Sequence, residues 1–116
     1  MIDNPEQTER LVAKLTQALP FPALTAPPTL AALKEQAPDL DLTPRCRVTQ
    51  IHYAGDEGGI LCKLDFGVGE DRKVFYVSIT HLAFDRRLPL AREIAAYQRH
   101  RVKRLRREGP GPSGIP

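Results

Sequence analysis

The side chains best suited to chemistry in this sequence are the basic ones near its C-terminal end. Residues 85–108 hold nine arginines and lysines against three acids, whereas residues 1–44 hold three basic residues against six acids. Guanidinium groups match phosphate oxygens with paired hydrogen bonds, and concentrated positive charge attracts polyanions. The segment therefore predicts a surface that binds nucleic-acid backbone or an acidic protein. The predicted binding residues are Arg86, Arg87, Arg92, Arg99, Lys103, Arg106 and Arg107.

One long helix is predicted to carry most of these side chains. At about 100° per residue, a mostly apolar stripe falls on one side of residues 90–105, and the other side is basic. Pro89 suits the first helical position, and Gly109-Pro110 suits the end. We expect the apolar stripe to pack on a sheet and the basic side to face solvent. The stripe contains Leu90, Ala91, Ile94, Ala95, Tyr97, Gln98, Arg101, Val102 and Leu105.

Three strands are predicted to support this helix. Residues 45–54, 60–66 and 73–80 are rich in β-branched and aromatic residues and are separated by glycine-containing turns. Pairing Ala54 with Ile60 would make an antiparallel meander in which one apolar face takes the C-terminal helix. The second face would carry four aromatic or basic residues. These are Arg47, Tyr53, Lys63 and Tyr76.

These four residues form a possible platform for single-stranded bases, because aromatic rings stack on bases and basic groups pair with phosphates. The alternative is that the N-terminal helix covers this face. We favour the alternative, since Ile51, Leu61 and Val74 are expected there and apolar side chains need a partner.

Catalytic and metal-binding arrangements are weaker in this sequence. His52 and Cys62 lie opposite each other in the expected register, but the further ligands that a metal site needs are missing at suitable spacings. We interpret both as buried structural residues. Four acids, Asp56, Glu57, Glu70 and Asp71, fall in the two turns between the strands, and the glycines of those turns lie in hairpins rather than before a helix. We therefore predict no enzymatic activity, no metal and no cofactor.

The N-terminal part, residues 1–27, is predicted to contain a helix over residues 5–19, capped by Asn4, and a stiff connector over residues 20–28 with four prolines. A short helix over residues 28–37 should turn Leu30 and Leu33 inward. The expected fold class is α+β, with the order α-α-β-β-β-α in a single domain over residues 1–108 and its core in residues 28–108. Residues 109–116 are predicted to be a disordered tail.

Length and composition agree with a small binding protein. A chain of 116 residues with 41% hydrophobic content supports one modest core. Two cysteines provide no disulfide framework, and neither a charged leader nor an apolar run of about 18 residues is present. These features predict a cytoplasmic protein without a membrane span.

The order of helix, three strands and helix over residues 28–108 resembles that of double-stranded RNA-binding domains. That family places a glycine and a lysine cluster at the start of its last helix, whereas the corresponding stretch here, HLAFDRRLPLAREI, has only Arg86 and Arg87 as basic residues. The resemblance implies an element order, and no binding residue is carried over from it.

The expected function is non-enzymatic binding to RNA or DNA backbone through the basic C-terminal helix, without base specificity. The alternative is a protein-interaction or assembly module whose basic helix docks an acidic protein. Both hypotheses use the same arginines.

Overall fold

Three α-helices and a five-stranded antiparallel sheet make up the described part of the chain, which is residues 3–67 and 75–108 of the computed structural model. The predicted α+β class is therefore confirmed, but the predicted three-stranded meander is only part of the sheet, because two further strands extend it. The helices are α1 (Pro5–Ala18), α2 (Pro27–Gln36) and α3 (Ala91–Glu108). The strands are β1 (Phe21–Thr25), β2 (Arg45–Tyr53), β3 (Ile60–Asp65), β4 (Phe75–Ser78) and β5 (Leu82–Ala83).

Strand β1 lies within the segment that was expected to be a stiff connector. Its side chains alternate between buried and exposed, and Phe21 and Ala23 pair with Val48 and Cys46 of β2. Strand β5 pairs only with Leu24 and Thr25 of β1, so at Pro22 the strand has β2 as its one neighbour. The N–H that proline lacks is tolerated at such an edge position. Proline also favours the extended backbone of a strand, and composition alone does not separate a proline-rich connector from such a strand.

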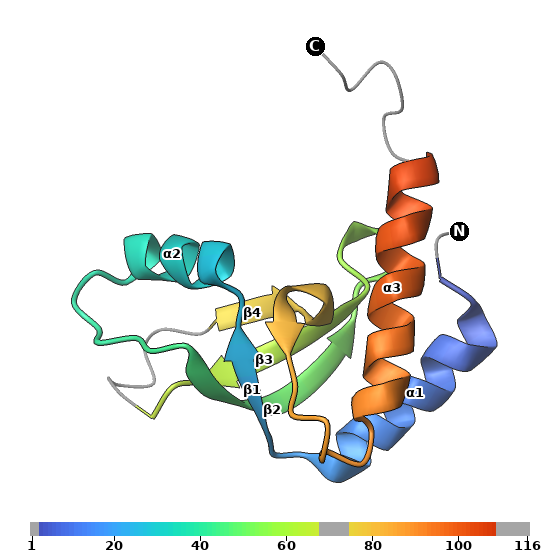
Figure 1. The fold of residues 1–116 in the computed structure, drawn as a ribbon, viewed down its shortest axis with the longest axis horizontal. Coiled ribbons are helices and arrows are strands. Elements are labelled where there is room, and N and C mark those ends of the chain that lie inside the picture. The colour runs from blue at the N-terminus through green and yellow to red at the C-terminus, as the bar shows by residue number, and fades with distance from the viewer. Residues whose placement is uncertain (1–2, 68–74, 109–116) are drawn as a thin grey trace.

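The sheet has the order β4-β3-β2-β1-β5, so the meander of β2, β3 and β4 is extended by β1 and then by β5. Figure 1 shows α1 and α3 together at one end of the sheet and α2 at the other end. Two strands, β1 and β5, therefore have no counterpart in the order of helix, three strands and helix that resembles double-stranded RNA-binding domains.

All three helices contribute to one core on one face of the sheet. Leu15 of α1, Leu33 of α2 and Ile94 of α3 are buried in the same cluster as Val48 and Cys62. The expectation that α1 covers the opposite face is therefore wrong, and α1 lies beside α3. We call the face that the helices cover the inner face, and the opposite one the outer face.

A bulge in β2 explains this correction. The observed partner of Ile60 is Tyr53 rather than Ala54, and the register shifts between Val48 and Gln50. Ile51 therefore lies opposite Cys62 and turns inward, while His52 pairs with Leu61 on the outer face. The outer face loses an apolar residue that was expected there and needs no helix to cover it. The predicted juxtaposition of His52 with Cys62 is also wrong. Continuing the expected register would pair Phe66 with Lys73, and Lys73 lies outside the described residues.

Helix α3 begins two residues later than predicted. Pro89 lies in the preceding turn, where the Ala91 N–H donates to the Leu88 carbonyl, and the first helical residue is Ala91. Helix α1 agrees closely with its prediction, and the Gln7 N–H donates to Asn4 Oδ1 at its N-terminus. None of the helices in the described part of the chain combines the length and the hydropathy needed to cross a bilayer.

Candidate nucleic-acid interface

Four basic side chains form a row along the solvent side of α3. Each of them is exposed, and each lies on the side of the helix away from Ile94 and Tyr97. At about 100° and 1.5 Å per residue they fall within an arc of about 60° and extend over about 21 Å of helix. Among the described side chains, none of the four forms an ion pair. We call this row the basic stripe, and its members are Arg92, Arg99, Lys103 and Arg106.

The described acid next to Arg92 on α3 is already neutralised. Glu93 follows Arg92 on α3, and both of its carboxylate oxygens accept from Lys14 Nζ of α1 at 3.1 Å. This ion pair is half exposed, so it contributes little to stability. Its importance lies in leaving the positive charge of the stripe uncompensated.

The remaining predicted binding residues of this segment lie elsewhere or are not described. Arg86 and Arg87 are exposed in the turn before α3, and Arg87 pairs with Asp85 at 3.4 Å. The hydrogen bonds that Asp85 accepts from the backbone and side chain of Arg87 lower the pKa of its carboxyl. Arg107 belongs to α3, but its side chain lies outside the described residues. Arg86 therefore adds a positive charge without an ion-pair partner among the described side chains, whereas Arg87 is paired with Asp85.

One arginine of α3 points inward. Arg101 is 2% exposed, and its Nη1 donates to Asp3 Oδ2 at 3.0 Å in an ion pair whose side chains are almost fully buried. Its Nη2 donates to the backbone carbonyl of Asp56 at 2.8 Å. The sequence stripe correctly placed Arg101 toward the core, but Val102 and Leu105, which were assigned to the same stripe, are exposed. Asp3 was not foreseen as its partner, because the two residues are 98 positions apart.

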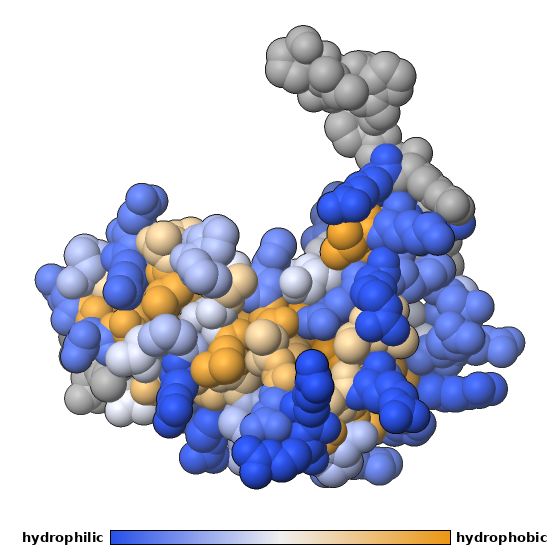
Figure 2. Space-filling model, in the orientation of Figure 1, coloured by the Kyte–Doolittle hydropathy of each residue, from blue (hydrophilic) through white to orange (hydrophobic). Residues whose placement is uncertain are grey.

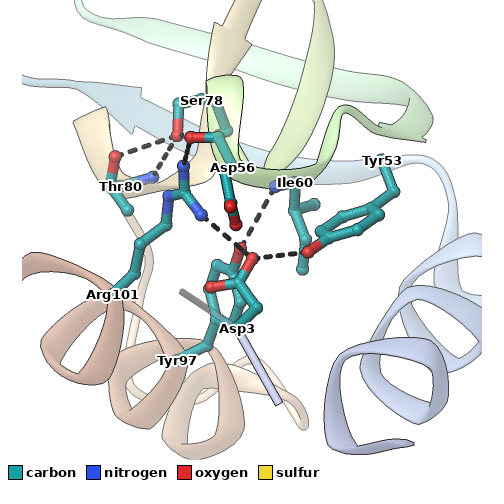
Figure 3. A network of polar contacts seen from close by, with 9 residues as sticks. Asp3, Tyr53, Asp56, Ile60, Ser78, Thr80, Tyr97 and Arg101 are labelled. Atoms are coloured by element: carbon teal, nitrogen blue, oxygen red, sulfur yellow. Dashed lines mark hydrogen bonds and ion pairs between the residues drawn. The ribbon is translucent and has the colours of Figure 1, made fainter. Parts of the chain in front are cut away.

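Two tyrosines complete the arrangement around Asp3, as Figure 3 shows. The hydroxyls of Tyr53 and Tyr97 donate to Asp3 Oδ2 at 2.7 Å and 2.9 Å, and the Tyr97 hydroxyl accepts from the Ile60 N–H. Desolvation and the hydrogen bond to Asp3 raise the pKa of Tyr53 to about 12. The same causes raise the pKa of Tyr97. We call these four residues, Asp3, Tyr53, Tyr97 and Arg101, the Asp3–Arg101 network.

Gly59 makes room for this network at the end of the β2–β3 hairpin. Its φ of +68° lies in the left-handed region, which favours glycine. A Cβ there would overlap the Tyr97 hydroxyl and lie 2.8 Å from Arg101 Cζ. The glycine-rich turn that the sequence shows is therefore required both for the hairpin and for the close approach of α3.

The network sets the rotation of α3 about its own axis. Arg101 and Tyr97 attach it to the N-terminal segment and the hairpin, and Gln98 Nε2 donates to the carbonyls of Ile79 and Leu82 at 2.7 Å each. With this side fixed inward, the basic stripe must face solvent.

The predicted sheet platform is only partly assembled. Lys63 pairs with Tyr76 and Arg47 with Asp65, and these four side chains lie on the outer face. Tyr53 lies on the inner face, because the bulge in β2 reverses the expected alternation, and its hydroxyl binds Asp3 instead. The platform set that included Tyr53 is therefore corrected. His52 takes its place, with its ring centroid 5.5 Å from that of Tyr76.

The cysteines and possible metal ligands do not assemble into a site within the described residues. Cys46 and Cys62 are both free and buried, and burial raises the pKa of their thiols to about 11 and about 12. No group of three or more His, Cys, Asp or Glu side chains in the described ranges is arranged to hold a metal ion.

Comparison with protein-family models, with curated proteins and with solved structures found no match for this chain. Its interpretation therefore depends on the geometry of its own residues.

Proposed function

We propose that this protein is a non-enzymatic nucleic-acid-binding protein that contacts the phosphate backbone through the basic stripe of α3. The observation that carries the proposal is the row of four exposed basic side chains that have no ion-pair partner among the described residues. The acid beside them, Glu93, is already neutralised by Lys14. Such a row provides electrostatic attraction and phosphate contacts but no pattern of donors and acceptors for reading base edges. We therefore expect binding to RNA or DNA without base specificity.

The size of the stripe suits this ligand. Phosphates follow one strand of B-form DNA at about 3.4 Å of rise, so about 21 Å of helix matches about six nucleotides of one strand. Three of the four basic side chains are arginines, and the planar guanidinium group binds phosphate oxygens in pairs. The stripe also extends toward the C-terminal end of α3, which projects beyond the sheet in Figure 1.

Salt dependence of binding tests this proposal directly. Fluorescence anisotropy of a labelled DNA duplex should show that affinity falls steeply with salt. A plot of the logarithm of the binding constant against the logarithm of salt concentration should have a slope of about −3.6 if all four basic side chains contact phosphates. Replacing Arg99→Glu and Lys103→Glu together should reduce affinity at least tenfold. It should also make the slope shallower, to about −1.8 or closer to zero, since about two phosphate contacts are lost.

A matched variant separates local contacts from total charge. Arg10→Glu with Lys34→Glu changes the net charge by the same amount at exposed positions of α1 and α2. Its binding should fall much less than that of the α3 variant. Equal losses in the two variants would contradict a defined interface on α3, and the absence of binding at low salt to both RNA and DNA would reject the proposal.

A second candidate function is docking of an acidic protein, and one observation favours it. Figure 2 shows a hydrophobic patch between hydrophilic side chains on the C-terminal part of α3, and Val102 and Leu105 are 39% and 38% exposed there. They border a shallow pocket of about 520 Å³ that also includes Thr80, His81 and Arg106. An acidic partner with apolar anchors would use this pocket, whereas phosphate binding would not.

The two functions respond differently to apolar substitutions. Val102→Ser with Leu105→Ser leaves every charge in place, so nucleic-acid affinity should stay within about twofold if phosphates are the target. Loss of a protein partner by this variant, together with unchanged binding to duplex DNA, would favour the second candidate.

A further inference from the structure

The outer face of the sheet is left open by the helices. Because α1, α2 and α3 all pack on the inner face, the described side chains of β2, β3 and β4 on the other side are exposed or half-buried. His52 and Tyr76 are exposed, and Tyr76 is 48% exposed despite its large aromatic ring. This face was expected to be covered, so its chemistry needs a separate explanation.

Two aromatic rings meet above β3 on this face. The ring of His52 on β2 and the ring of Tyr76 on β4 have centroids 5.5 Å apart and planes inclined by 65°. His52 Nε2 also lies 3.2 Å from Gln50 Oε1. The edge contact and the hydrogen bond limit the rotation of the His52 ring, so the pair offers a pre-ordered aromatic surface to a ligand.

Basic side chains share the outer face with the aromatic pair. Arg45 and Arg47 alternate along β2 on the outer face, and Lys63 lies directly between Gln50 and Tyr76 across the sheet. Asp65 is the acid of this face within the described residues, and its Oδ1 accepts from the Gly67 N–H at 2.8 Å. Three basic groups against one partly satisfied carboxylate give this face a positive charge.

We propose that the outer face binds unpaired bases of single-stranded nucleic acid, which stack on Tyr76 and His52 while Arg45, Arg47 and Lys63 contact the flanking phosphates. This inference rests on the proposed function, because the nucleic-acid ligand is taken from the charge of α3. It adds a second surface and a preference for strands whose bases are accessible.

The chemistry of the face favours a single strand over other anionic ligands. Bases in a duplex are already stacked on each other, so they do not lie on an aromatic pair without unpairing. An acidic peptide would satisfy the three basic groups but has no flat ring to place on Tyr76. Stacking on aromatic side chains is sequence-tolerant, which agrees with the absence of base readout on α3.

A comparison of two probes tests this inference. A labelled oligothymidylate of about eight nucleotides and a labelled random-sequence DNA duplex are titrated with the protein. Tyr76→Ala should lower affinity for the oligothymidylate about tenfold and leave affinity for the duplex within about twofold, because only unpaired bases use the ring. Tyr76→Phe keeps the ring and should bind both probes like the unmodified protein.

Intrinsic fluorescence gives an independent readout. The chain has three tyrosines and no tryptophan. A base stacked on Tyr76 should quench part of the tyrosine emission when the oligothymidylate is added, and the quenching should be lost in Tyr76→Phe even though affinity is retained. Circular dichroism melting checks that each variant folds, as expected for substitutions at an exposed position.

The outcomes separate this inference from the proposed function. Equal effects of Tyr76→Ala on both probes, or no effect on either, contradict the proposed stacking surface. The α3 variants test the basic stripe separately. Tyr76-dependent binding of a polyglutamate peptide with an affinity matching that of the oligothymidylate overturns it as well. Selective loss of single-strand binding in Tyr76→Ala, with rescue by Tyr76→Phe, supports it.

Discussion

Arg101 and the basic stripe belong to the same helix, but they experience opposite environments. Arg101 is 2% exposed and is neutralised by Asp3, whereas Arg92, Arg99 and Lys103 are exposed and have no ion-pair partner among the described side chains. The difference arises from helical phase alone, since Arg101 follows Arg99 by two residues and therefore lies on the far side. Arginines of one helix thus divide between a buried ion pair and exposed positions, and we propose that the exposed ones bind the ligand.

The comparison shows how charge on one helix is separated by role. A buried arginine needs a buried carboxylate and further hydrogen bonds to offset its desolvation, and Asp3 with the Asp56 carbonyl provides them. Exposed arginines need none of these and retain their charge for a partner. Substitutions should therefore act on stability at Arg101 and on binding in the stripe.

The largest effect on stability is expected for Arg101→Met. This change leaves the Asp3 carboxylate buried without its cation, and should lower the free energy of unfolding by about 3–5 kcal/mol. Urea unfolding followed by circular dichroism measures the loss. Removing both charges, with Asp3→Asn and Arg101→Met together, should cost clearly less than Arg101→Met alone, since no unpaired charge remains. A loss below about 1 kcal/mol for Arg101→Met would mean that the ion pair does not anchor α3.

A smaller loss is expected for Gly59→Ala. Here φ is +68°, and the new Cβ would press on Tyr97 and Arg101, so strain and overlap together should cost about 2–4 kcal/mol. Gly55→Ala is the matched control, because its φ is +65° but nothing lies within 4 Å of the added Cβ. It should cost only the backbone strain, about 1 kcal/mol. Equal losses at both positions would show that the approach of α3 to the hairpin is not tight.

The sequence predicted the helices better than the sheet, for physical reasons. The periodicity and capping that define α1 and α3 are local, and Ile94 of the predicted stripe is buried as expected. Strand β1 was missed because four prolines over residues 20–28 resemble a connector. The bulge between Val48 and Gln50 was missed because a one-residue shift leaves no mark in composition, although it exchanges the two faces of the strand.

The basic stripe was predictable, and the Asp3–Arg101 network was not. The stripe follows from helical phase, whereas the network joins residues 3, 53, 97 and 101 through the tertiary fold. One signal was available: an arginine between Tyr97 and Leu105 on a core-facing stripe requires a buried acid. The sequence contains fourteen acids and does not indicate which one, so only the fold identifies Asp3.

Alkaline pH should weaken the Asp3–Arg101 network. The pKa of Tyr53 is raised to about 12 and that of Tyr97 is also raised, whereas an unfolded tyrosine titrates near about pH 10. Above that pH the unfolded chain binds fewer protons than the folded one, so the free energy of unfolding falls as pH rises toward 12. Urea unfolding across this pH range measures the decline.

Tyrosine variants show whether this decline comes from the network. Tyr97→Phe should itself cost about 1–3 kcal/mol, because the Ile60 N–H and Asp3 lose a partner, and it should reduce the decline above pH 10. Tyr76→Phe lies outside the network and should leave the decline as it is. A decline that is unchanged in both Tyr97→Phe and Tyr53→Phe would assign it to other groups.

The smallest effect on stability is expected where the effect on binding is largest. Arg99→Glu with Lys103→Glu should change the free energy of unfolding by no more than about 0.5 kcal/mol, because both side chains are exposed and lose no described contact. Relief of like-charge repulsion along the stripe and an acid near the C-terminal end of the helix dipole act in opposite directions. Urea unfolding at low salt measures their net effect, which should shrink at high salt because both contributions are screened. A loss comparable to that of Arg101→Met would mean that Arg99 or Lys103 is buried, so that α3 is rotated about its axis relative to this structure. The separation between a buried arginine that stabilises the fold and exposed ones that bind a ligand would then be wrong.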